Sequence, residues 1–191
     1  MAGLGTIALV GDSLTANGRW DEWLAGERVL NFGVSGSTTN DVVQRLPEII
    51  AAQPDTVVVL IGTNDLAWRR TVEHIVRNIE TVLVVVRRDL VDSRILVQSV
   101  TPRGTEFADQ IRDINRHLWQ FAPAVRAQYL DLWPALALED GELRPELTDD
   151  GLHLNDLGYE MWLSELLPAL ERLADQPPAS RAIILPDLGG L

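Results

Sequence analysis

The feature that most constrains the fold is the run Thr56-Val57-Val58-Val59-Leu60-Ile61, which is apolar almost throughout. A strand with one solvated face alternates apolar and polar residues, and this run has no polar face. Such runs are typical of parallel strands covered on both faces by helices. Four further short runs rich in apolar and β-branched residues are expected as strands, over residues 7–10, 29–32, 95–99 and 128–130.

Helical patterns separate these runs. In residues 41–52 the apolar positions fall on one helical face, behind the capping signal Thr38-x-x-Asp41. Further helices are expected over residues 72–88, 106–121 and 156–173, the last with Asn155 as its N-cap. Alternation of strands and helices with short loops predicts an α/β fold, a parallel sheet with helices on both faces.

The length of 191 residues suits a single domain, expected here over residues 1–174. The tail, 175–191, contains Pro177-Pro178 and Gly189-Gly190 and breaks from helical character. Its apolar stretch 183–185 is expected to pack on its own domain or on a neighbouring subunit, so a homodimer is left open.

The composition of the chain argues against several classes of binding partner and several kinds of chemistry. The formal net charge is −12, which opposes binding to nucleic acid or to an anionic membrane. Stable membrane insertion is not expected, because no apolar run approaches the roughly 18–20 residues of a membrane span. The N-terminus lacks a positively charged leader pattern, which favours a cytoplasmic location. With no cysteine and three scattered histidines, neither disulfides nor a metal site are expected.

Ser13 is the candidate nucleophile. It lies in Gly11-Asp12-Ser13-Leu14, where the first predicted strand breaks into a turn, and there we expect it to be exposed and rigidly held. In parallel α/β sheets, ligands bind outside the carboxyl ends of the strands. The loop 33–39 and Gly62-Thr63-Asn64-Asp65 also follow predicted strands, so all three segments should meet at one edge.

A serine hydroxyl is a poor nucleophile until a base removes its proton. His153 is the candidate base, since an imidazole titrates near neutral pH. Asp150, three residues earlier in Asp150-Gly151-Leu152-His153, can fold back to orient that ring, with Asp149 as the neighbouring alternative. These residues predict a serine nucleophile, its base and an orienting carboxylate.

Two further residues could stabilise negative charge on a reacting oxygen. Gly36 offers a backbone N–H that no side chain shields, and Asn64 offers a neutral amide N–H. With the N–H of Ser13 they would supply three donors. Each residue also has an ordinary structural explanation as a turn or cap residue, but their joint occurrence at successive strand ends favours catalysis.

Other chemistries on this architecture fit less well. A phosphoryl-accepting receiver needs a lysine late in the chain, and the chain has no lysine. A dehalogenase-type phosphatase needs Asp-x-Asp after the first strand, where the sequence is Asp12-Ser13-Leu14. Asp12 is therefore expected to bond nearby loop N–H groups, and Asp65 to brace the turn that holds Asn64.

The aromatic residues and the other histidines receive weaker assignments. Trp20, Trp23 and Trp68 follow the predicted site segments and could line a substrate pocket, with ordinary packing as the alternative. Trp119 and Trp162 lie in predicted helices and are expected to be packing residues. His74 and His117 are expected on helix surfaces.

Four ordered segments resemble those of the SGNH hydrolase superfamily, also called GDSL esterases and lipases. Ser13 matches the first block of that family, Gly36 the second, Asn64 the third and Asp150-x-x-His153 the fifth. The resemblance spans residues 7 to about 170, and the segment 31–39 is similar to small acetylhydrolase-type members.

The resemblance implies a flavodoxin-like three-layer α/β/α sandwich with a central parallel sheet of about five strands. It also implies a Ser-His-Asp triad and no cofactor or metal. The implied activity is hydrolysis of a small-molecule carboxylic ester, with acetyl as the expected acyl group. A lysophospholipid or thioester hydrolase of longer acyl preference, and a catalytically dead binding module, are the alternatives.

Overall fold

The computed structural model describes residues 3–175 and shows five parallel strands in one sheet, in the order β2-β1-β3-β4-β5. The strands are β1 (Thr6–Gly11), β2 (Arg28–Gly33), β3 (Thr56–Leu60), β4 (Arg94–Gln98) and β5 (Gln128–Leu130). All four neighbouring pairs are parallel, as expected. This is the flavodoxin-like order, in which the chain reverses direction across the sheet between β1 and β3.

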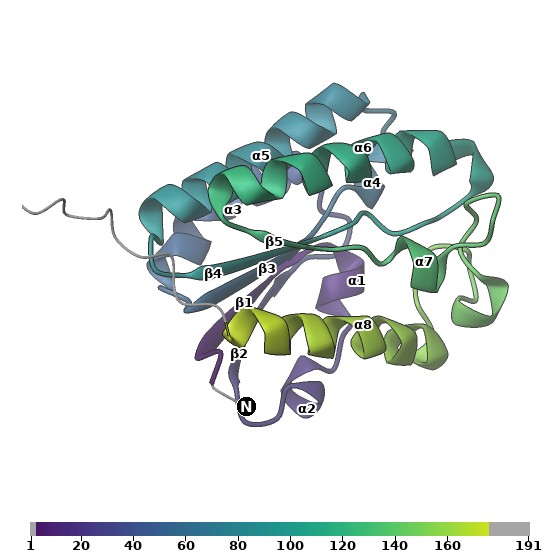
Figure 1. The fold of residues 1–191 in the computed structure, drawn as a ribbon. Helices are drawn as coiled ribbons and strands as arrows, with labels where there is room; N and C mark the ends of the chain where they lie inside the picture. Colours follow the sequence, from purple (N-terminus) through teal and green to yellow (C-terminus); the bar gives the residue numbers. More distant parts are fainter. Residues whose placement is uncertain (1–2, 176–191) are drawn as a thin grey trace, which may run out of the picture.

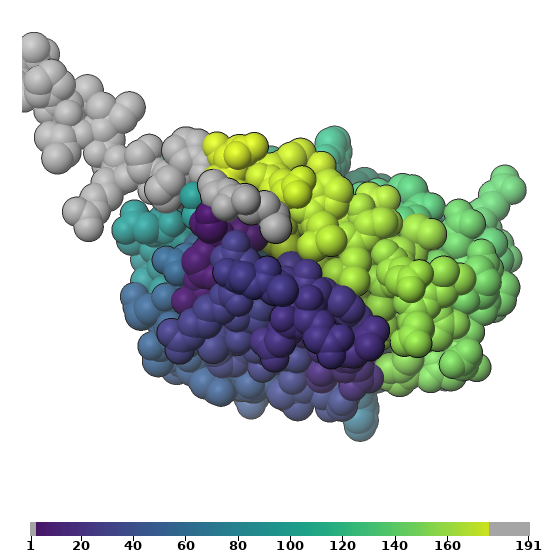
Figure 2. Space-filling view, turned by 90° about the horizontal axis from the view of Figure 1, so that it is seen from below, coloured from purple at the N-terminus to yellow at the C-terminus, as the bar shows by residue number. Residues whose placement is uncertain are grey.

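Helices cover both faces of the sheet, so the fold is the predicted three-layer α/β/α sandwich (Figure 1). One layer holds α3 (Thr39–Ala51), α5 (Val72–Asp89) and α6 (Ala108–Phe121). The other holds α1 (Ser13–Ala16), α2 (Trp20–Trp23) and α8 (Asp156–Ala174). Figure 2 shows this second face, with α8 beside the N-terminal segment that contains α2. Two short helices, α4 (Thr63–Ala67) and α7 (Trp133–Leu136), and 3-10 turns at Thr105–Phe107, Ala122–Val125 and Pro145–Leu147 complete the elements.

Alternate residues of the central strands enter two separate cores. In β3, Val57 and Val59 pack among the α3, α5 and α6 side chains, whereas Val58 and Leu60 pack with α8. All four side chains are at most 2% exposed. Because each fully buried valine or leucine contributes about 1.5–3 kcal/mol, a strand of this kind is stable only between two layers. The continuous apolar run is thus explained.

The predicted helix signals are present in the structure. Thr38 and Asp41 form a reciprocal capping box at the start of α3. Asn155 caps α8 by accepting a hydrogen bond from the Gly158 N–H at 3.0 Å. α8 ends at Ala174, where the tail was expected to begin, and the predicted packing of that tail falls outside the described residues. Within residues 3–175, no helix is long and apolar enough to cross a membrane.

The first three strands end level with one another. Gly11 at the end of β1 pairs with Gly33 of β2 on one side and with Leu60 of β3 on the other. A Cβ on Gly11 would lie 2.4 Å from the Leu60 carbonyl oxygen and 2.1 Å from Thr15 Oγ1, so only glycine fits. This close approach lets α1 turn back over the sheet directly after β1.

Candidate active site

Ser13 is the first residue of α1 and lies two residues after the end of β1. Its two neighbours in the chain, Asp12 and Leu14, are fixed by hydrogen bonds. Asp12 is the N-cap, and its Oδ1 accepts a hydrogen bond from the Leu14 N–H at 3.0 Å. The Tyr159 hydroxyl of α8 donates to the Leu14 carbonyl at 2.8 Å. The expected rigid hold is present, but the expected exposure was wrong. Ser13 is only 8% exposed, because it begins a helix packed on the sheet.

A continuous chain of hydrogen bonds joins the three predicted triad side chains. Ser13 Oγ lies 3.0 Å from His153 Nε2, and His153 Nδ1 lies 2.7 Å from Asp150 Oδ2. Since a carboxylate only accepts, Nδ1 carries the ring proton and Nε2 is left to accept from the serine hydroxyl. The structure brings Asp150, and not Asp149, to the imidazole. This geometry permits proton transfer from a nucleophile to a base.

Thr148 closes the loop between the 3-10 turn Pro145–Leu147 and α8 through its side-chain hydrogen bonds. The sequence did not point to this residue. The Thr148 hydroxyl donates to the His153 carbonyl at 2.6 Å and accepts from the Gly151 N–H at 3.0 Å. Asp150 Oδ1 accepts from the N–H groups of Leu152 and His153 at 2.9 and 2.7 Å. A threonine two residues before an aspartate is a recurring turn pattern and could have signalled this loop.

The pKa values of the two carboxylates near His153 are shifted in opposite directions. The bond from the imidazole, followed by the His153 backbone N–H, holds the pKa of Asp150 well below its usual range. Burial raises the pKa of Asp12 to about 6, against the smaller lowering effects of the Leu14 N–H and the His153 charge. Asp12 is fully buried, and its Oδ2 has no hydrogen-bond partner among the described residues. Asp12 thus caps α1 at an electrostatic cost.

The raised pKa of Asp12 predicts that the free energy of unfolding depends on pH. Because the folded pKa of Asp12 exceeds the unfolded value of 3.8, ionising it disfavours the folded state as pH rises from about 4 through 6. Asp12→Asn keeps an oxygen for the Leu14 N–H and removes the titration. The free energy of unfolding of the variant, relative to the unsubstituted protein, should therefore increase by about 2 kcal/mol between pH 4 and pH 7.

Urea unfolding at both pH values measures this difference. Asp41→Asn is the matched control, because hydrogen bonds from the Thr38 side chain and backbone lower the pKa of Asp41. Its relative stability should fall slightly over the same pH interval, which is the opposite sign. Parallel pH profiles for Asp12→Asn and the unsubstituted protein would contradict the raised pKa of Asp12.

Gly36 lies in a tight turn next to the end of β1. The Val34 N–H donates to the Gly11 carbonyl at 3.1 Å, and the Ser37 N–H closes the turn on the Val34 carbonyl at 3.1 Å. Gly36 is the third residue of this turn and has φ +80°, a conformation that glycine adopts without strain. The turn is thereby tied to the end of β1, two residues before Ser13.

Asn64 follows β3 in the first turn of α4, and its amide orientation is set by a hydrogen bond. Nδ2 donates to the Ser37 carbonyl at 2.9 Å, which leaves the second N–H of the same amide for another acceptor. We expected Asp65 to brace the turn that holds Asn64. Its carboxylate reaches across to Thr39, accepting from the backbone N–H at 2.8 Å and from the hydroxyl at 2.7 Å.

The structure separates the three tryptophans predicted to line a pocket. Trp20 is 3% exposed, with ring contacts to Trp23 and Trp162 and an indole N–H donating to the Thr15 carbonyl, so its predicted pocket role was wrong. Trp23 is half-buried against Trp20 and Tyr159. Trp68, just after α4, is 70% exposed and remains available at the C-terminal edge of the sheet.

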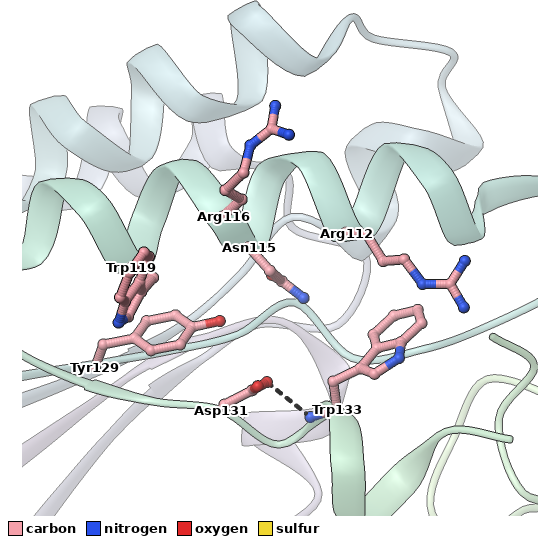
Figure 3. Close-up of a pocket in the computed structure, with 7 residues that line it drawn as sticks. All are labelled: Arg112, Asn115, Arg116, Trp119, Tyr129, Asp131 and Trp133. Carbon is pink, nitrogen blue, oxygen red and sulfur yellow. Dashed lines mark hydrogen bonds between the residues drawn. The ribbon is translucent and has the colours of Figure 1, made fainter. Parts of the chain in front are cut away.

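A cavity of about 570 Å³ lies elsewhere, between α6 and the β5 edge (Figure 3). Its lining consists of Arg112, Asn115, Arg116, Trp119, Tyr129, Asp131 and Trp133. β5 is three strands from β1, roughly 14 Å across the sheet, and no triad residue lines the cavity. Trp119 borders it and is 61% exposed, so its predicted packing role was wrong, whereas Trp162 is 1% exposed and packs as expected.

His74 is half-buried on α5, and His117 lies on the α6 surface, as expected. His117 has a carboxylate neighbour, Asp113, at 3.7 Å. Among residues 3–175, no group of three or more histidine and acidic side chains could hold a metal ion.

Comparison with known proteins identifies the family of the chain. A family described as GDSL-like lipase/acylhydrolase matches residues 9–161. Platelet-activating factor acetylhydrolase IB subunit alpha1 of Bos taurus is 30% identical over 95% of this chain and 82% of its own. The alpha2 subunit of Rattus norvegicus is 27% identical over 92% of this chain and 80% of its own.

Solved structures share the fold. A GDSL-like lipase of Bacteroides thetaiotaomicron has a TM-score of 0.76 at 22% identity, covering 87% of this chain and 88% of that protein. An acetyl xylan esterase has a TM-score of 0.73 at 20% identity, covering 86% and 99%. The chain therefore belongs to the GDSL-like lipase/acylhydrolase family of the SGNH hydrolase superfamily, which identifies it as a carboxylic ester hydrolase.

Proposed function

We propose that the chain is a serine esterase that hydrolyses short-acyl esters of small molecules through an acyl-enzyme. The observation that carries this proposal is the unbroken hydrogen-bond chain from Ser13 through His153 to Asp150. In the proposed reaction, Ser13 Oγ attacks the ester carbonyl while its proton passes to His153 Nε2. Asp150 orients the ring and stabilises the imidazolium that forms.

The tetrahedral intermediate places a negative charge on the former carbonyl oxygen. We assign its stabilisation to the N–H groups of Ser13 and Gly36 and to the free amide N–H of Asn64. Collapse of the intermediate breaks the ester C–O bond, and His153 returns its proton to the leaving alcohol. Water then attacks the acyl-serine with His153 again as base, releasing the carboxylic acid and restoring the Ser13 hydroxyl.

An acetyl group is the proposed acyl portion. Two features support it, namely the similarity to a protein named as an acetylhydrolase and the acetylhydrolase-like segment 31–39 that carries Gly36. The alternatives are a longer acyl chain, as in a lysophospholipase or thioesterase, and a binding module without catalysis. Trp68 is the one predicted pocket tryptophan whose exposure suits contact with the substrate.

A chain-length series tests the proposal. On p-nitrophenyl esters with acyl chains of two to twelve carbons, we expect kcat/KM to be highest for the acetate and about tenfold lower or more by eight carbons, as a small acyl pocket excludes added methylenes. Steady-state kinetics at one pH give the values. A maximum at eight carbons or longer would replace acetyl by the longer-chain alternative, and hydrolysis no faster than buffer across the series would favour the binding module.

A further inference from the structure

The two loops that carry Gly36 and Asn64 are joined side by side by three hydrogen bonds. Asn64 Nδ2 donates to the Ser37 carbonyl at 2.9 Å. The next residue, Asp65, accepts from both the N–H and the hydroxyl of Thr39, at 2.8 and 2.7 Å. The adjacent residues Asn64 and Asp65 thus hydrogen-bond to Ser37 and Thr39, which are two residues apart in the other segment.

The Thr39–Asp65 contact is buried and fully satisfied. Both residues are 0% exposed, and the Thr39 hydroxyl also accepts from Asn78 Nδ2 at 3.0 Å. Thr39 is the first residue of α3, so its N–H has no partner within the helix. The Asp65 carboxylate therefore accepts a hydrogen bond from the Thr39 N–H at the N-terminus of α3, a donor that would otherwise be unpaired. The contact is buried away from water. We expect this contact to keep a single geometry, because breaking it would leave the buried Asp65 carboxylate without its hydrogen-bond donors.

The contact lies next to both donors assigned to the oxyanion. Thr39 is three residues after Gly36, and Asp65 directly follows Asn64. Donors act on a transition state only if they are fixed where charge develops, and a shift of about 1 Å in a positioned group can lower the rate by about 10²-fold. We propose that Thr39 and Asp65 are positioning residues that hold the Gly36 N–H and the Asn64 amide in register with each other. This inference rests on the proposed function.

The experiment removes the hydroxyl and keeps the side-chain shape. Thr39→Val should lower kcat for p-nitrophenyl acetate by about tenfold with KM changed less than about twofold, because the donors act on the transition state and not on the bound ester. Thr39→Ser keeps the hydroxyl and should recover kcat to within about threefold of the unsubstituted protein. Should Thr39→Val fail to fold, Asp65→Asn provides the same comparison, since its amide cannot accept both Thr39 bonds.

Thr38→Val is the matched control. Thr38 is the adjacent threonine, and its hydroxyl bonds Asp41 within α3 at 2.7 Å and does not contact the Asn64 loop. Losing that cap should destabilise α3 while lowering kcat less than about twofold. An equal loss of kcat in Thr38→Val and Thr39→Val, at matched loss of stability, would overturn the positioning role and leave a general effect of helix instability.

Asn64→Ala distinguishes failure of this inference from failure of the proposed function. Removal of an oxyanion donor should lower kcat by about 10²–10³-fold, and an unchanged kcat would contradict the proposed function itself. On the Asn64→Ala background, Thr39→Val should lower kcat by less than its effect alone, because it acts partly through the missing amide. Fully additive losses, or a normal kcat in Thr39→Val beside an impaired Asn64→Ala, would refute the positioning role alone.

Discussion

Ser13→Ala is expected to lower kcat for p-nitrophenyl acetate by about 10⁴-fold or more, leaving the protein folded. The acyl-enzyme cannot form without the Oγ, and the remaining donors can only assist slow attack by water. Folding should change little. Alanine is a good helix former at the start of α1, and within residues 3–175 the lost hydroxyl hydrogen-bonds only to His153. Steady-state kinetics and urea unfolding measure the two effects.

A fluorophosphonate probe provides a second measurement on the same variant. The probe should label the unsubstituted protein at Ser13, identified by peptide mass spectrometry, and should not label Ser13→Ala. Ser164→Ala is the control, because Ser164 is exposed on α8 and, in the described part of the chain, its hydroxyl bonds only to Met161 of the same helix. Activity retained by Ser13→Ala, or labelling at a different residue, would contradict the assigned nucleophile.

The sheet and its layers could be predicted because their causes are local. A run such as residues 56–61 has no polar face, so the chain can bury it only in a parallel strand between two helical layers. Likewise, Thr38 and Asp41 specify the start of α3 through bonds within three residues of sequence. Where the cause lies in adjacent residues, the expected element and its bounds agree with the structure to within a few residues.

The assignments of Trp20 and Trp119 failed because nearness in sequence does not determine a direction in space. Trp20 follows Ser13 by seven residues, but α2 turns its ring into the core against Trp162. On α6, Ile111, Ile114 and Leu118 form the buried stripe. Trp119 lies about 100° around the helix from Leu118 and therefore faces outward.

The surroundings of the two buried carboxylates could be predicted only in part. The bond from the Leu14 N–H to Asp12 was expected, because the two residues are neighbours in sequence, but the partner of Asp65 and the pKa of Asp12 were not. Asp65 finds Thr39 26 residues earlier in the chain, so its partner exists only once β1 and β3 have paired and α3 has packed. The raised pKa of Asp12 comes from burial beneath α1 and α8, which no motif encodes. By contrast, Asp150 and His153 are three residues apart, and their contact was predicted because a single loop can close it.

Asp150→Asn is expected to lower kcat for the acetate ester by about 10²–10⁴-fold with little change in KM. The oxygen of the new amide can keep the bonds from the Leu152 and His153 N–H groups that Asp150 Oδ1 now accepts. The amide nitrogen then faces His153 Nδ1, where the carboxylate now accepts at 2.7 Å. Two donors cannot share that contact, so the ring proton moves to Nε2, and Nε2 can no longer accept the proton of Ser13.

Asp149→Asn is the control that separates orientation from charge. It removes the same charge one residue away, from an exposed side chain, and should leave kcat within about twofold. The Asp150 side chain is itself 53% exposed, so solvent screens its Coulomb attraction for His153. The loss in Asp150→Asn should therefore persist in 0.5 M salt, because the wrong tautomer, and not a weakened field, causes it. Equal losses in both variants, or recovery of Asp150→Asn at high salt, would assign the effect to loop charge and remove Asp150 from the triad.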